Sequence, residues 1–174
     1  MMTNAAKLAR AMALVLPVTA FAGYSALAQS VLDVVGTWTL VSSVIEKDGA
    51  KTDQYGAGAR GMMSLDTDEY FMLTIIMLTI IGPDLPRFAS GNRATGTPEE
   101  NKAVVGKSIA MIGTYSVNPA DRTLTFKVER ATFPNWDGTE QKRSIVSVSS
   151  DGLKYTSASA SVGGPATTTW KRAK

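Results

Sequence analysis

The 174-residue sequence contains no cysteine and no histidine. Without cysteine, the chain has no disulfide bonds, no thiolate nucleophile and no thiolate metal ligand. Without histidine, it lacks the side chain that most often serves as a general base near neutral pH and as a metal ligand. A serine–histidine catalytic triad and a histidine zinc site are therefore excluded, and we expect no metal and no cofactor.

The chain also carries little net charge. Its formal charge is +3, but Lys7 and Arg10 lie in the first 28 residues, which hold no acidic residue. The remaining chain carries 16 basic and 15 acidic residues, and its basic residues are not concentrated in one long cluster. Because nucleic-acid binding requires a concentrated basic face, we expect no nucleic-acid partner.

The first 28 residues have the layout of a bacterial signal peptide. Lys7 and Arg10 form a short positive region, residues 11–22 are almost wholly apolar, and Ala26-Leu27-Ala28 supplies small residues before Gln29. The apolar stretch is too short to span a bilayer, which disfavours a membrane helix. We therefore expect a signal peptide over 1–28 and a single mature domain over 29–174 that is periplasmic or secreted.

The mature chain consists of short alternating apolar and polar runs separated by turn residues, a pattern typical of antiparallel β-sheet proteins. In the clearest run, Leu124, Phe126 and Val128 alternate with polar residues, so that one face is suited to a core and the other to water. The turn residues delimit strands at 36–46, 51–55, 61–65, 69–81, 109–117, 122–130, 141–149, 153–161 and 166–172.

Two segments interrupt this pattern. A long loop over 82–96 leads to Thr97-Pro98-Glu99-Glu100, where a capping threonine, a proline and a glutamate predict the start of a short helix that ends near Gly106. Residues 72–76 (MLTII) are repeated as residues 77–81. Since strand side chains alternate with period two, an odd insertion reverses the facing of every later residue. We therefore expect a bulge or other irregularity between Phe71 and Ile81.

Several short motifs are spread over residues 34–174. Gly36-Thr37-Trp38 starts the first strand, and Trp170-Lys171-Arg172 ends the last one. Between them lie Tyr55-Gly56, Pro86-Arg87-Phe88, Thr97-Pro98-Glu99-Glu100, Gly113-Thr114-Tyr115 and the segment 134–139. Together these motifs resemble the bacterial and fungal lipocalin-like domain family; the first matches the lipocalin G-x-W motif, and the last matches the basic residue that packs over that tryptophan. The resemblance implies a mainly β fold: one antiparallel lipocalin-like barrel of about eight strands with a central cavity, here with one short mid-chain helix.

A barrel of this kind has one interior and two ends. At one end we expect a structural closure, with Trp38 buried beneath a basic side chain, from Gly36, Trp38, Trp170 and Arg172. A ligand would enter at the other end, between the 82–96 loop and the 132–138 hairpin loop. Candidate ligand-binding residues are Tyr55, Tyr70, Arg87, Tyr115, Asn135, Trp136 and Arg143, because aromatic bodies with polar tips and a few charges suit a mostly apolar pocket.

The face shared by Leu153, Tyr155, Ser157 and Ser159 changes from bulky to small and hydroxylated. It either lines a cavity or forms an edge that is turned outward. The sequence does not choose between these two placements.

Several functions remain open at this stage. The leading hypothesis is a binder of a small apolar or amphipathic molecule. The alternatives are a cyclase or isomerase that uses the same cavity, and a structural module with a filled core. Catalytic residues are unknown, because no carboxylate falls on a clearly inward face. An outer-membrane barrel is disfavoured, because the strand over 122–130 carries threonine, lysine and glutamate opposite its apolar face.

The signal peptide leads to a direct prediction. N-terminal sequencing of the exported protein should begin at Gln29, because Ala26 and Ala28 supply the small residues that signal peptidase requires. Soluble protein that retains residues 1–28 would contradict this prediction.

Overall fold

The computed structural model describes residues 34–66, 70–77 and 84–174, and for residues 70–77 the backbone only. The expected signal peptide and Tyr70's side chain lie outside the described part. The strands are β1 (Gly36–Lys47), β2 (Ala50–Asp53), β3 (Ala59–Leu65), β4 (Tyr70–Met77), β5 (Ser108–Asn118), β6 (Thr123–Ala131), β7 (Glu140–Val148), β8 (Gly152–Ser157) and β9 (Ala166–Arg172). The helices are α2 (Pro98–Lys107) and the short 3-10 turns η2 (Arg93–Thr95) and η3 (Pro134–Trp136).

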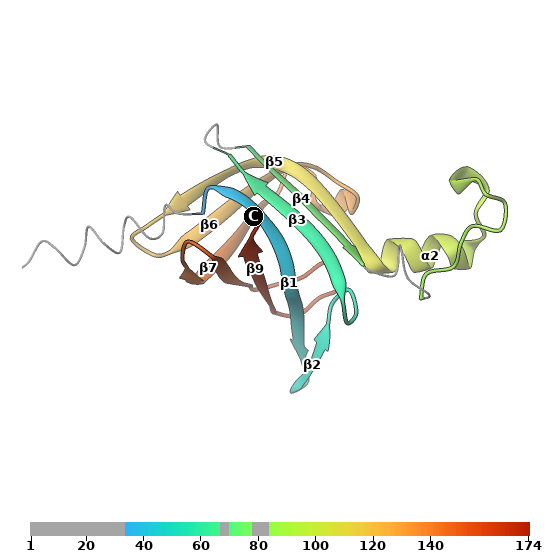
Figure 1. Cartoon of the computed structure of the whole chain (residues 1–174), viewed down its shortest axis with the longest axis horizontal. Coiled ribbons are helices and arrows are strands. Elements are labelled where there is room, and N and C mark those ends of the chain that lie inside the picture. The colour runs from blue at the N-terminus through green and yellow to red at the C-terminus, as the bar shows by residue number, and fades with distance from the viewer. Residues whose placement is uncertain (1–33, 67–69, 78–83) are drawn as a thin grey trace, which may run out of the picture.

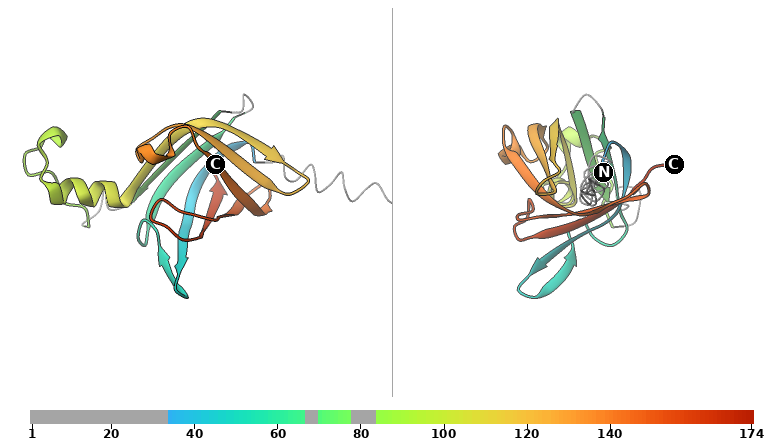
Figure 2. Two further views of the ribbon diagram at one scale, coloured as in Figure 1. Left: turned by 180° about the vertical axis from the view of Figure 1, so that it is seen from behind. Right: turned by 90° about the vertical axis from the view of Figure 1, so that its left-hand side faces the viewer.

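All pairings in the sheet are antiparallel, and the sheet curls into a barrel (Figure 1). The strands follow one another in the order β2-β1-β3-β4-β5-β6-β7-β8-β9, and β1 pairs with β9 to join the two ends. Eight strands thus surround the interior, and the right-hand view of Figure 2 shows how the sheet curls around it. The ninth, β2, pairs only with the far end of β1, from Val44 to Lys47, and its residues are exposed.

The interior is filled by the inward residues of the alternating strands. In β6, Leu124, Phe126 and Val128 are all buried, and Lys127 between them is exposed. The buried cluster comprises Val34, Trp38, Tyr55, Met63, Leu65, Ile109, Met111, Tyr115, Leu124, Phe126, Val128, Ile145, Leu153, Tyr155 and Trp170. An eight-stranded barrel is just wide enough for its own side chains, which is why one cluster occupies most of the space.

Trp38 and Arg172 close one end of the barrel. Trp38 is fully buried, its indole N–H donates to the Val34 carbonyl at 2.7 Å, and the Arg172 guanidinium lies 4.1 Å above its ring. Arg172 also donates to the carbonyls of Val35 and Ser150. Gly36 has a φ of 133°, and a side chain there would collide with Arg172. The contact between Trp38 and Arg172 that the sequence led us to expect is therefore present.

Most predicted elements are found within a few residues of their expected positions. The Asp48-Gly49 hairpin turn has positive φ at both residues, and β9 spans the expected residues. Two strands are shorter than expected: β2 ends at Asp53 and β8 at Ser157. The expected irregularity in the repeated segment is not seen up to Met77, because β4 pairs with β3 and β5 without a register shift. Residues 78–81, most of the second copy, lie outside the described residues.

The predicted capping box at the start of α2 is present. Glu100 N–H donates to the Thr97 hydroxyl, and the Glu100 carboxylate accepts from the backbone of both Thr97 and Ala89 at 2.8 Å. These bonds explain why a glutamate is buried here. The helix ends directly before β5 and projects away from the barrel (Figures 1 and 2). No helix among the described residues has the length and apolar character needed to cross a membrane.

The closed end provides a stability prediction. Trp38→Ala should lower the free energy of unfolding by about 3–5 kcal/mol, the usual range for a large aromatic side chain lost from a core. Urea denaturation of the mature chain measures this loss. Val41 lies on the same strand but is 54% exposed, so Val41→Ala should change stability by less than about 0.5 kcal/mol. Similar losses for both variants would show that Trp38 does not seal the barrel.

Candidate functional site

The end of the barrel opposite Trp38 carries the longer connections. The β2–β3, β6–β7 and β8–β9 connections meet there, and β5 begins there after α2. The antiparallel register places Ala166 beside Ser157 and Ile45 at this end, whereas Trp38 pairs with Arg172 at the other. We call it the open end.

Two adjoining hollows lie at the open end. The inner chamber has a volume of about 30 Å³, which is close to the share of one water molecule in the liquid. It is lined by Gln54, Tyr55, Met111, Trp136, Gln141, Arg143, Tyr155, Ser157, Ser159, Ala160, Ala166 and Thr168. The vestibule outside it has a volume of about 560 Å³ and is lined by Trp136, Thr139, Glu140, Gln141, Lys142, Arg143, Ser157, Ala158 and Ser159. Because the hollows share five lining residues, we treat them as one site.

Arg143 is the charged group of the inner chamber. It faces inward from β7 and is only 5% exposed. Its guanidinium lies 4.1 Å from the centre of the Phe126 ring and 5.6 Å from that of Tyr155. It donates to the backbone carbonyl of Gln141 at 2.9 Å and to the Gln141 side-chain oxygen at 2.8 Å. These partners are all uncharged, so none of them balances the positive charge of the guanidinium.

Burial lowers the pKa of Arg143, and the neighbouring hydroxyls of Tyr155 and Tyr55 partly offset this effect. A guanidinium nevertheless stays protonated at physiological pH. Burial also raises the pKa of Tyr55, as does Tyr155 nearby, while Ser161 and Arg143 act in the opposite direction. Tyr55 is therefore a neutral hydroxyl in the working pH range.

Small hydroxylated side chains form one wall of the chamber. Leu153 and Tyr155 are buried in the barrel, and Ser157 and Ser159 continue the same face into the chamber wall. Of the two placements that the sequence left open for this face, the structure shows the cavity-lining one. A second group of polar side chains lies next to this wall. In it, the Ser43 hydroxyl lies 3.3 Å from the Thr168 hydroxyl and donates a hydrogen bond to the Gln54 side-chain oxygen.

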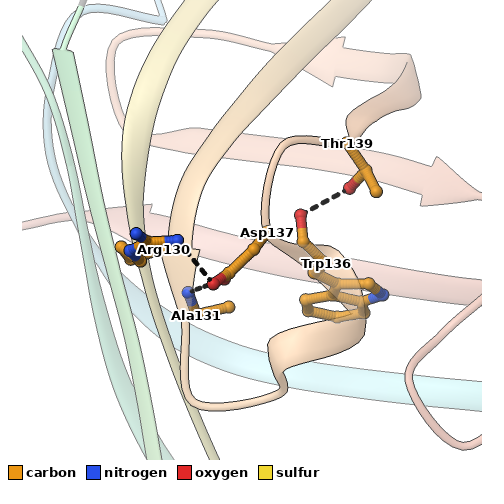
Figure 3. A network of polar contacts seen from close by, with 5 residues as sticks. All are labelled: Arg130, Ala131, Trp136, Asp137 and Thr139. Atoms are coloured by element: carbon orange, nitrogen blue, oxygen red, sulfur yellow. Dashed lines mark hydrogen bonds and ion pairs between the residues drawn. The ribbon is translucent and has the colours of Figure 1, made fainter.

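The β6–β7 hairpin positions Trp136 at the junction of chamber and vestibule (Figure 3). The Asp137 carboxylate accepts from Arg130 at 3.0 Å and from the backbone N–H of Ala131 at 2.8 Å. The Thr139 hydroxyl donates to the Trp136 carbonyl at 2.7 Å. Phe133 packs against the indole edge-on, with ring centres 5.6 Å apart. Because both ends of the turn are held, the indole remains at the mouth.

The structure brings together three of the residues proposed from the sequence and separates others from them. Tyr55, Trp136 and Arg143 line the chamber. Arg87 and Asn135 are exposed and line neither hollow. Tyr115 donates to the Asp66 carbonyl toward the closed end. Of the two loops expected to frame the mouth, the 132–138 loop contributes Trp136, whereas the described residues 84–96 line neither hollow.

Several chamber residues were not identified from the sequence, chief among them Gln141 and Thr168. Gln141 lies two positions before Arg143 on one strand, so strand alternation places both on the same face. This alternation could have identified Gln141 as a chamber residue, given that Arg143 faces inward. Strand alternation also predicts that Thr168 faces inward, because Ala166 and Trp170, two positions away on either side in β9, are buried.

Comparison with known proteins identifies one family. A family model described as a lipocalin-like domain matches residues 35–173. Among curated proteins, none matches the chain. Among solved structures, a de novo designed fluorescence-activating β-barrel is similar, with 13% identity and a TM-score of 0.39 over 84% of this chain and 96% of the design.

The raised pKa of Tyr55 predicts a pH dependence. An unfolded tyrosine ionises near pH 10, so the advantage of burying the neutral hydroxyl is complete below about pH 10. It is lost as the pH rises toward the higher pKa of the folded state. Urea denaturation between about pH 8 and about pH 11 should show the wild type losing up to about 1.4 kcal/mol per pH unit more than Tyr55→Phe above pH 10. Parallel curves for the two proteins would contradict this prediction.

Proposed function

Because the chain belongs to the lipocalin-like domain family, we propose that it binds a small apolar or amphipathic molecule at the open end of the barrel. The observation that carries the proposal is the pair of adjoining hollows there. The vestibule volume of about 560 Å³ falls in the usual range for small-molecule sites. Trp136 at the junction offers an aromatic surface for the body of a ligand.

The distribution of core residues supports binding over a purely structural role. Large side chains such as Trp38, Phe126 and Trp170 fill the closed end and the middle of the barrel. The open end instead carries small hydroxylated residues and a buried arginine. A barrel with only a structural role gains nothing from a buried charge, because apolar side chains of similar volume are usually at least as stable there.

The lining also favours binding over a cyclase or isomerase. Proton transfer at neutral pH requires a group whose pKa lies near the operating pH. The described residues that line the inner chamber include no aspartate or glutamate, and Glu140, which lines the vestibule, is exposed. Tyr55 has its pKa shifted upward, away from neutrality. The polar groups of the chamber are thus suited to hold and orient a molecule.

We further propose that this binding takes place outside the cytoplasm, in the periplasm or after secretion. The support for this location is the layout of residues 1–28, with its short positive region, apolar stretch and small residues before Gln29.

Chemical-shift mapping with an uncharged aromatic probe tests the proposed site. The three tryptophans (Trp38, Trp136 and Trp170) give three indole N–H resonances in a ¹⁵N-labelled mature chain. Millimolar 2-naphthamide should shift the Trp136 resonance, because its indole lines both hollows. The Trp38 resonance should stay in place, because it lies at the opposite end. Trp136→Phe assigns the signal, and an unmoved Trp136 resonance, or a shift confined to Trp38, would contradict the proposal.

A further inference from the structure

The interior of the barrel contains hydrogen-bond donors that its own residues leave unused. Arg143 Nε and Gln141 Nε2 are buried and have no hydrogen-bond partner among the described residues. Both side chains line the inner chamber. Two orphan donors at one place favour a ligand group that only accepts hydrogen bonds.

The charge of the chamber favours an anion. Among the described residues, no carboxylate lies within ion-pair distance of Arg143, since the two ion pairs found join Lys51 to Glu46 and Arg130 to Asp137. A buried charge without a counter-charge is costly, and an incoming anion would remove that cost. In the vestibule, Lys142 and Glu140 carry opposite charges, so Arg143 decides which sign is attracted inward.

The dimensions limit the kind of anion. A chamber of about 30 Å³ is only a few atoms in size, since a cavity needs roughly 10–15 Å³ to hold one water. The two oxygens of a carboxylate therefore suit it better than the four oxygens of a phosphate or sulfate. The planar fork of a guanidinium also matches the two oxygens of a carboxylate. The larger vestibule, bounded by Trp136 and Ala158, is left for the rest of the molecule.

We propose that the ligand is an amphipathic monocarboxylate that enters with its carboxylate first. The carboxylate binds Arg143 and the amide of Gln141 in the inner chamber, and the apolar body lies against Trp136 in the vestibule. This assignment rests on the proposed function and adds the chemical class and the orientation of the ligand.

A matched pair of probes tests the assignment on the mature chain. 2-Naphthoate and 2-naphthamide share one aromatic body and differ in the charge of the head group. Isothermal titration calorimetry at pH 7 should show at least about tenfold tighter binding of the carboxylate, because charge-assisted hydrogen bonds are roughly twice as strong as neutral ones. Equal affinities would overturn the carboxylate assignment and leave the proposed function standing, whereas binding of neither probe would contradict both.

Gln141→Glu is the sharpest variant. It keeps the shape of the side chain and places a carboxylate where Gln141 already accepts a hydrogen bond from Arg143 at 2.8 Å. The new carboxylate then pairs with the Arg143 guanidinium and balances its charge. The affinity for 2-naphthoate should therefore fall at least about tenfold, whereas the affinity for 2-naphthamide should stay within about twofold. An unchanged 2-naphthoate affinity would overturn the proposal.

Arg143→Met removes the charge directly and should show the same selective loss. Replacing a buried charge with an apolar side chain is often neutral or stabilising. Unshifted resonances of Trp38 and Trp170, which are buried and line neither hollow, verify the fold. Arg143→Lys, which keeps the charge, should retain a reduced preference for the carboxylate.

Lys154→Met is the control, because it removes one exposed positive charge from β8 outside both hollows. The proposed role of the Arg143 charge would be overturned by either of two results. One is an equal loss of affinity for both probes in Arg143→Met, and the other is a loss of 2-naphthoate affinity in Lys154→Met.

Discussion

The pairing of β1 with β9 determines the rest of this structure. It converts an open sheet into a closed barrel, which leaves no long unpaired edge among the eight strands of the ring. Closure also limits the interior, because an eight-stranded barrel is barely wider than its own side chains. Each inward position must therefore either contribute a side chain to the core or leave part of the interior open. Large residues occupy these positions from Trp38 through Phe126, and small hydroxylated ones occupy them beside Ser157 and Thr168.

Two arginines that lie over aromatic rings show how differently the two ends of the barrel are used. Arg172 covers the Trp38 ring and donates to two backbone carbonyls. Its guanidinium thereby holds the segment before β1 against the last strand. Arg143 also lies over an aromatic ring, but its hydrogen-bond partners among the described residues, Gln141 and Tyr155, are uncharged. The charged side chain of the closed end thus has backbone partners within the fold, whereas the open end retains buried donors of Gln141 and Arg143 that can serve a ligand.

The closed end was predictable because its determinants are local in sequence. Gly36 and Trp38 are two residues apart, and Trp170 and Arg172 mark the last strand, so short motifs carry the information. Strand positions were predictable for the same reason, since alternation is visible over a few residues in runs such as Leu124-Phe126-Val128. Strand ends were less predictable: Ser159 and Ser161 continue the alternation of β8 after its ladder with β9 has ended.

The open end was only partly predictable because it is assembled from distant segments. Arg143 and Tyr155 lie on the paired strands β7 and β8, but Tyr55 follows β2 and joins them only when β1 closes on β9. Residue type alone did not separate Arg143, buried on β7, from Arg87, exposed in a loop. Tyr115 had the same aromatic and hydroxyl character as Tyr55, but its register places its hydroxyl against Asp66. Only the registers of the paired strands distinguish these cases.

The small chamber and the larger vestibule differ in how they could select a ligand. An apolar interior discriminates weakly, because one methylene is worth only about 1–3 kcal/mol of binding free energy. Here the interior is mostly filled, and the open volume lies in the vestibule, where the body of the proposed ligand would meet Trp136 and solvent. On this proposal, selection by the shape of the body would be weak. Selection by the head group would be strong, because a group without acceptors would leave the donors of Arg143 and Gln141 unpaired. The proposed site would thus select the chemical class of its ligand at the inner chamber and tolerate variety at the mouth.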